Sequence, residues 1–353
     1  MKMEAFSAAS GVYQFGHNAV TTDDSISLKK LAISGTRSIV AEQFGLYTSF
    51  FNNDAVYADT LITKAFSRDT PFVEASDDQI SEIIVRALQT MVMYMYSLEK
   101  FHDAAHLCGL GETNESIMSW EEGVAALVGS IEGPDLGGRP NGQLMFALSK
   151  QLCSQFSTCQ KTNSGSRSSK ANEIIINFLK QGALDISEGD CGDVHDSLTY
   201  SLERMLKASL IQGTLHFAAV NAVPQMRVGS LAGSVASGHV MANSIVPLIP
   251  DIHKAEADLI MSNMNFELKW KPVPDGAAAV FQAMAYSLQG LQVDCEDVGV
   301  YAGIKNGDIC LLSVSKLSTP VEPTPRPPTP SDTEPDFPPP NLDYTFTSNA
   351  DDQ

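Results

Sequence analysis

The stretch QISEIIVRALQTMVMYMYSLEKFHDAAHL, from Gln79 to Leu107, decides the fold class of this chain. Its apolar residues recur at steps of three and four, which is the period of an α-helix with one buried face. Ser76 and Asp77 precede the stretch and favour a helix start, and Gly109 follows it and favours a helix end. We therefore expect one long amphipathic helix here.

Helical patterns also dominate the rest of the chain, over residues 120–133, 144–156, 172–182, 193–223, 229–249, 253–265 and 277–291. Only Ile309 to Val314 alternates between apolar and polar residues, as a half-buried strand would. The predicted class is mainly α. Residues 1–50 show no pattern strong enough for an assignment.

An internal resemblance indicates two halves. YSLEKFHDAA begins at Tyr96 and YSLERMLKAS at Tyr200, and each lies in a long predicted helix that is followed by a helix of small residues. The polar stretch from Lys161 to Ser169 separates them, so we place the halves at 51–165 and 166–317. We expect two pseudo-repeated helical bundles with a cleft between them, where small ligands usually bind.

The last residues, 318–353, differ in composition from the rest of the chain. Proline and acidic residues dominate, and apolar residues nearly vanish. Such a segment cannot bury enough apolar surface to fold, so we expect a disordered, extended tail. It fits a stalk to a wall or membrane anchor, a passive tail, or a ligand for an SH3 domain through Pro325 to Pro328.

Charge and length exclude several functions. The chain has 353 residues, 43% of them hydrophobic, and a net charge of −19. Nucleic acid and anionic lipid both favour a basic surface, so neither is an expected partner. No apolar run is long enough for a transmembrane segment, and no signal peptide is visible at the start. Either the protein is cytosolic, or this chain lacks its original N-terminus.

Catalytic motifs are missing from the sequence. There is no GxSxG, HExxH or phosphate-binding loop, and Glu99-x-x-His102 has no second copy of the kind that a di-iron ferroxidase needs. We expect no enzyme. The six cysteines form no CxxC pair, and the spacing of Cys153 and Cys159 fits a small disulfide loop as well as two buried thiols.

Several segments, in the same order along the chain, resemble the Fe-assimilating, low-iron-induced proteins of algae. This family is related to the phytotransferrins and was also described as high-CO2-induced periplasmic proteins. WEEGVAALVGSIEG, from Trp120 to Gly133, is similar to the family's WDEAVAFYxGSLEG. LSKQLCSQFSTC, LIQGTLHFA and VFQAMAYSLQGLQVDCEDVGVY resemble further family segments. The resemblance covers roughly residues 55–305.

The resemblance implies an extracellular, periplasmic or cell-surface protein that captures ferric iron and passes it to a cell-surface uptake system. Carbonate as a synergistic anion is implied by analogy with transferrin-like relatives. The cysteines are then expected as disulfides, with Cys153–Cys159 first. This chain departs from the family in three places: Leu127 and Val128 replace an aromatic pair, Ser237 replaces a carboxylate, and Ser287 and Leu288 lie where the family has a cysteine.

Ferric iron favours carboxylate, phenolate and imidazole ligands, and the long helix offers one candidate set. Glu99, His102, Asp103 and His106 are three or four residues apart, so they share one side of the helix. A core histidine beside a solvated acidic face explains the same pattern. The family supports the carboxylate of Glu99 and not the histidines.

Glu121, Glu122 and Glu132 form the second candidate metal set, because the family signature carries them. The first two lie in an expected first helical turn, where carboxylates favour the helix dipole without any ligand. Glu132 lies at the expected helix end, where the dipole disfavours it, so a ligand role explains it better. We rank Glu122 and Glu132 ahead of Glu121. The alternative function is a non-catalytic extracellular interaction protein, or a CO2-responsive one, without a metal site.

Overall fold

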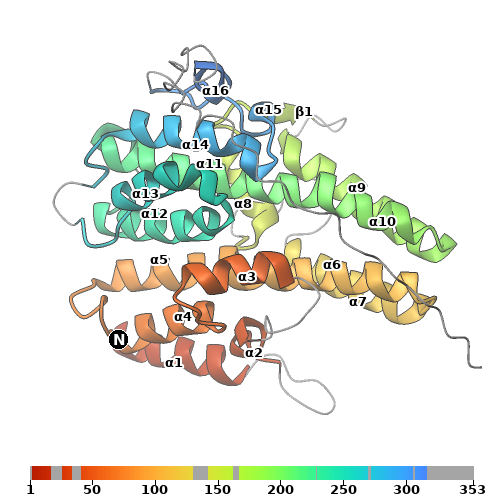
Figure 1. Cartoon of the computed structure of the whole chain (residues 1–353). Helices are drawn as coiled ribbons and strands as arrows, with labels where there is room; N and C mark the ends of the chain where they lie inside the picture. The colour runs from red at the N-terminus through yellow and green to blue at the C-terminus, as the bar shows by residue number, and fades with distance from the viewer. Residues whose placement is uncertain are drawn as a thin grey trace, which may run out of the picture. The chain divides into compact units, whose positions relative to one another are not determined.

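Figure 1 shows the computed structural model of the chain, which describes residues 2–16, 26–33, 41–129, 142–161, 167–227, 229–268, 272–304 and 307–315. The first half contains α1 (Lys2–Phe15), α2 (Leu28–Ile33), α3 (Ala41–Phe50), α4 (Tyr57–Ser67), α5 (Asp77–Ala87), η3 (Leu88–Met93), α6 (Tyr94–Gly109), α7 (Thr113–Leu127), α8 (Met145–Leu152) and β1 (Cys159–Lys161). The second half contains β2 (Arg167–Ser169), α9 (Lys170–Glu188), α10 (Cys191–Ser197), η4 (Leu198–Glu203), α11 (Arg204–Ala222), η5 (Pro224–Met226), α12 (Leu231–Ile245), η6 (Val246–Leu248), η7 (Asp251–His253), α13 (Lys254–Asn263), α14 (Ala277–Leu291), α15 (Cys295–Val298) and α16 (Ile309–Ser315). The predicted mainly helical class is confirmed.

Helices α5, η3 and α6 form the long helix that the sequence predicts. Ser76 and Gln79 build a capping box at its start, where each side chain accepts a hydrogen bond from the backbone N–H of the other residue. The helix buries Ile80, Ile83 and Ile84 on one face. The spacing of the apolar residues does not predict η3, the π-helical turn that lies between α5 and α6 in this long helix.

A second long helix, made of α10, η4 and α11, runs from Cys191 to Ala222 and also contains a π-helical turn. Both π-helical turns lie next to the YSLE motifs. Tyr96 follows η3 by three residues, and Tyr200 lies within η4. Each long helix therefore contains a π-helical turn beside or within its YSLE segment.

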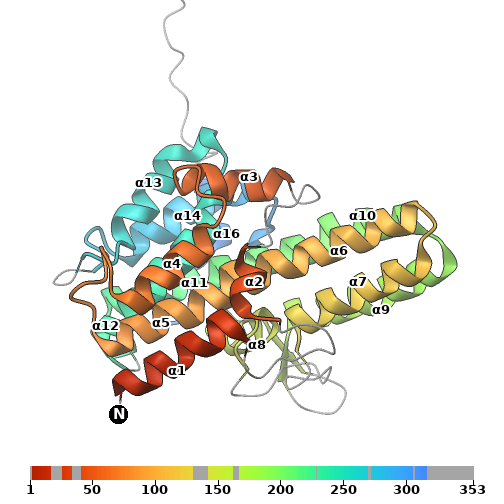
Figure 2. The ribbon, with the colours of Figure 1, turned by 90° about the horizontal axis from the view of Figure 1, so that it is seen from below.

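Each of the two long helices contributes one part to each of two groups of packed helices (Figures 1 and 2). One group packs α5 against α4 and α12, and α11 against α12 and α14. The other packs α6 against α7 and α10, with α9 against α7 and α10. One long helix comes from each half of the sequence, and each extends through both groups. Each group therefore contains helices from both halves of the sequence. The prediction of one bundle for each half is not confirmed, and the described helices belong to one compact unit that ends at Ser318.

Local differences from the predicted elements are small. The segment from Lys161 to Ser169, predicted as a linker, includes the strand β2, which pairs antiparallel with β1 from Cys159↔Ser169 onward. The alternating stretch from Ile309 is the helix α16 and not a strand. The N-terminal fifty residues contain α1, α2 and α3. The predicted disordered tail lies outside the described residues.

Three disulfides join all six cysteines, as the resemblance implies. Cys153–Cys159 closes a short loop, whereas Cys108–Cys191 links the end of α6 to the start of α10, 83 residues apart in sequence. Cys295–Cys310 joins α15 to α16. In the described part of the chain, no helix has both the length and the apolar content to cross a bilayer.

Candidate functional site

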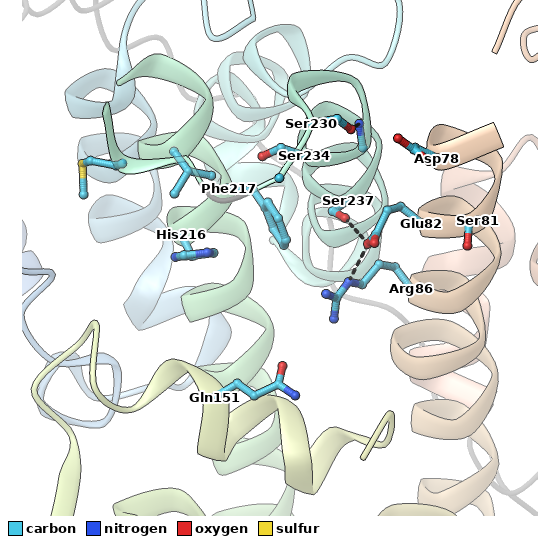
Figure 3. Close-up of a pocket in the computed structure, with 14 residues that line it drawn as sticks. Asp78, Ser81, Glu82, Arg86, Gln151, His216, Phe217, Ser230, Ser234 and Ser237 are labelled. Carbon is cyan, nitrogen blue, oxygen red and sulfur yellow. Dashed lines mark hydrogen bonds and ion pairs between the residues drawn. The ribbon is translucent and has the colours of Figure 1, made fainter. Parts of the chain in front are cut away.

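A cavity of about 620 Å³ lies between α5, α11 and α12 (Figure 3). Its walls are polar and apolar in about equal parts, and they come from distant parts of the sequence. The lining residues that carry polar side chains are Asp78, Ser81, Glu82, Arg86, Gln151, His216, Ser230, Ser234 and Ser237.

Helix α5 supplies the charged wall of the cavity. Asp78, Glu82 and Arg86 are spaced four residues apart, so they form one row along the helix surface. The neighbouring row, which contains Ile80 and Ile84, is buried in the core. The amphipathic pattern that drives helix formation therefore also directs the charged row toward the cavity.

Helix α12 supplies a wall of small residues. Its N-cap, Ser230, accepts a hydrogen bond from the backbone N–H of Gly233 at 3.0 Å. A Cβ atom on Gly233 would lie 3.5 Å from Cγ of Glu82 and 3.9 Å from Cβ of Asp78. The small side chains at the start of α12 thus leave the acidic end of the cavity open.

Glu82 and Arg86 form an ion pair on α5, and Ser237 of α12 is hydrogen-bonded directly to Glu82 (Figure 3). Nε of Arg86 lies 3.5 Å from Oε2 of Glu82, and the hydroxyl of Ser237 donates to the same oxygen at 2.6 Å. Nη1 of Arg86 donates to Gln89 at 2.8 Å. Burial lowers the pKa of Arg86 and Glu82 opposes that shift, so the guanidinium remains a cation at neutral pH.

His216 contributes a neutral imidazole. Its Nδ1 lies 3.1 Å from the hydroxyl of Tyr301. Burial, followed by the positive charge of Arg86, lowers the pKa of His216 to about 4. At neutral pH the ring therefore has one nitrogen with a free lone pair, and that nitrogen is Nε2 when Nδ1 donates its proton to Tyr301.

Glu99 and His102, two of the predicted metal ligands, lie on α6 away from this cavity. Nε2 of His102 is 3.0 Å from Oε1 of Glu203. Oε2 of Glu203 accepts from Gln43 at 2.5 Å and lies 3.7 Å from Nζ of Lys207. Glu99 is fully buried nearby. We call His102, Glu203, Gln43 and Lys207 the junction cluster, because it joins α3, α6, η4 and α11.

The other predicted ligands do not converge. Glu122 lies at the surface, where Lys100 is 2.5 Å away and Tyr96 donates at 3.1 Å. Glu121 is exposed beside an apolar groove on α7, and His106 is exposed near the end of α6. Glu132 lies outside the described residues.

Among the described residues, a single group of three potential metal donors has its ligand atoms within 4.8 Å of one another. It consists of Cys295, Glu296 and Cys310, and the two cysteines form a disulfide. Thiolates are the metal-binding form of cysteine, so this group is not a metal site as it stands. The donors of the cavity are more widely spaced.

Asp78, Glu82, Arg86 and His216 were not predicted as site residues. On the sequence alone, the row on α5 is indistinguishable from a solvated helix face with an i,i+4 ion pair. His216 lies inside an apolar helix. One signal was present, because Ser237 occupies a position where the resembled family carries a carboxylate, and this position faces Glu82.

Comparisons of the chain with models of protein families, with curated proteins and with solved structures found no match.

Proposed function

We propose that this chain binds ferric iron in the cavity between α5, α11 and α12, as a capture protein and not as a catalyst. The observation that carries the proposal is that two carboxylates and a neutral imidazole, from Asp78, Glu82 and His216, line the same cavity. Carboxylates and imidazole suit ferric iron. The resemblance to algal iron-assimilation proteins favours the same metal.

Each residue has a distinct role in this proposal. Glu82 is the central ligand, since Ser237 orients it by a hydrogen bond of 2.6 Å. Asp78 lies one helical turn earlier and supplies a second oxygen. His216 offers a neutral nitrogen to the bound ligand from the α11 wall of the cavity, with Tyr301 fixing its ring. Arg86 offers a positive charge to an anion that binds with the metal, and carbonate is one such anion.

Capture of iron outside the cell, followed by delivery to a cell-surface uptake system, is part of the proposal. Three disulfides favour an oxidising compartment, because thiols stay reduced in the cytosol. The net charge of −19 also favours attraction of a cation over attraction of a polyanion.

Iron retention by the purified full chain tests this function. The protein is incubated with ferric iron in bicarbonate buffer containing citrate, desalted, and assayed for iron by mass spectrometry. We expect stoichiometric retention by the natural sequence and a loss of at least about tenfold in Glu82→Gln and Asp78→Asn. Glu122→Gln is the matched control, since it removes a surface carboxylate that contacts Lys100.

The opposite results are equally informative. Retention that survives Glu82→Gln and is lost in Glu122→Gln would place the metal at the surface set instead. Retention by none of the proteins would contradict iron capture and leave an interaction protein without a metal as the function.

A further inference from the structure

The cavity donors are spaced too widely to enclose a bare metal ion. In an octahedral site with bonds of about 2.1 Å, neighbouring ligand atoms lie about 3 Å apart and opposite ones about 4.2 Å apart. Among the described Asp, Glu, His and Cys residues, only the Cys295 group places three donor atoms within 4.8 Å. Fewer than three of the cavity side chains therefore reach one ion, and other atoms must complete its coordination.

The size of the cavity agrees with a larger ligand. Its volume is about 620 Å³. A water molecule occupies about 30 Å³ in the liquid, so the space is roughly that of twenty water molecules. A single ion bound directly by side chains would leave most of this volume unused.

The charges of the cavity follow one row on α5, from the acidic Asp78 to Arg86, which pairs with Glu82 at 3.5 Å. Asp78 and Glu82 line the end near the start of α12, and Arg86 lies one turn farther along α5, with Gln151 below it (Figure 3). The face of Phe217 lies 5.7 Å from the guanidinium carbon of Arg86. A guanidinium forms paired hydrogen bonds with a carboxylate, so the Arg86 end of this row favours an anionic group next to the carboxylates, which favour a cation.

We propose that the cavity takes ferric iron as its complex with a small polycarboxylate. This inference rests on the proposed function. A free carboxylate of the complex binds Arg86, and the iron binds Glu82 and Asp78. Oxygen atoms of the polycarboxylate then fill the coordination positions that the protein leaves open, which explains both the wide donor spacing and the unused volume.

Citrate, labelled with carbon-14, serves as the probe. The full chain is loaded with ferric iron from three sources: labelled citrate, acetohydroxamate without any carboxylate, and acetohydroxamate with bicarbonate. After desalting, iron and label are counted on the same sample. We expect iron and label to be retained together from citrate, and at least about tenfold less iron from the other two sources.

Variants at Arg86 test the binding of the anion. Arg86→Gln should lose the label at least about tenfold, and Arg86→Lys should retain an intermediate amount, since lysine keeps the charge and lacks the planar fork. Circular dichroism checks that both variants fold. If Arg86→Gln does not fold, the shared retention of iron and label by the natural sequence still decides the question.

The outcomes separate this inference from the proposed function. Equal iron retention from acetohydroxamate, with or without bicarbonate, would overturn the polycarboxylate and leave iron capture intact. If the protein retained as much labelled citrate without iron as with it, the inference would also be overturned, because the ligand would then be the free acid. No iron from any source would overturn both.

Discussion

Two polar clusters lie along the same long helix, and they differ in what surrounds the central carboxylate. In the junction cluster, His102, Gln43 and Lys207 approach both oxygens of Glu203, whose side chain is only 7% exposed. In the cavity, Ser237 and Arg86 both approach Oε2 of Glu82, whose side chain is 39% exposed. The carboxylate of Glu203 is thus shielded from solvent, whereas the carboxylate of Glu82 is still accessible to solvent.

The disulfides next to the two clusters should differ most in their effect on stability. Cys108–Cys191 closes 83 residues near the junction cluster, whereas Cys153–Cys159 closes six residues near Gln151 of the cavity. Loop-closure entropy gives about 4.5 kcal/mol for the first and about 2.2 kcal/mol for the second. Urea unfolding of the two serine double variants measures both values. A larger loss from the short loop would contradict the comparison.

Glu203→Gln should lower the free energy of unfolding by about 3 kcal/mol, because it leaves Lys207 and His102 beside a neutral amide in a buried site. Glu82→Gln should lower it by only about 1 kcal/mol, since the Glu82 side chain is 39% exposed and Arg86, although only 17% exposed, keeps its hydrogen bond to Gln89. Chemical denaturation of both variants provides the measurement. Equal losses of unfolding free energy in the two variants would show that the two clusters do not differ in their contribution to stability.

Acid should destabilise the fold through two histidines, His216 in the cavity wall and His239 on α12. Burial lowers the pKa of His216 and of His239 to about 4, below the usual 6.5. Both rings are neutral in the folded chain, so their contribution is fully present above pH 6.5 and is lost as the pH falls toward 4. With partial exposure considered, we expect a loss of about 2 kcal/mol between pH 7 and pH 5.

His216→Gln sharpens this prediction. Denaturation at several pH values should show a smaller pH dependence in the variant, with the remainder due to His239. An unchanged dependence would show that His216 does not titrate as the burial of its ring implies.

Ser237→Glu should turn the cavity into a stronger iron site. A second carboxylate would face Glu82, where the serine hydroxyl now lies 2.6 Å away. We expect iron affinity to rise by about tenfold, equivalent to about 1.4 kcal/mol, while the iron-free protein loses thermal stability because two like charges meet. Competition with a chelator measures the affinity. Ser237→Ala is the control, and a rise in that variant would contradict a ligand role for the new carboxylate.

The sequence predicts the helices well where apolar spacing is strong. The predicted helix from Ala277 to Leu291 matches α14 at both ends, and Ser76 caps α5 as expected. The segment before residue 50 was not assigned, since helices such as α3 carry apolar residues without a clear face. Helix packing could not be predicted either, because an amphipathic pattern shows that a face is buried and not which helix covers it.

The candidate site could not be predicted for the same reason, because its residues meet only through the packing of different helices. Glu99 and His102 were recognised as neighbours on one helix, but the partner of His102 is Glu203, which lies 101 residues later in the chain. Similarly, Glu82 becomes a candidate ligand only because α12 brings Ser237 to it across 155 residues. Spacing within one helix is visible in a sequence, whereas contacts between helices arise only from the tertiary fold.

One measurement tests the distinction between the two clusters most directly: iron retention and the free energy of unfolding, determined side by side for Glu82→Gln and Glu203→Gln. We predict that Glu82→Gln loses iron and keeps most of its stability, while Glu203→Gln loses stability and, where it remains folded, keeps iron. Iron lost in Glu203→Gln and retained in Glu82→Gln would contradict the account and place the metal at the junction cluster.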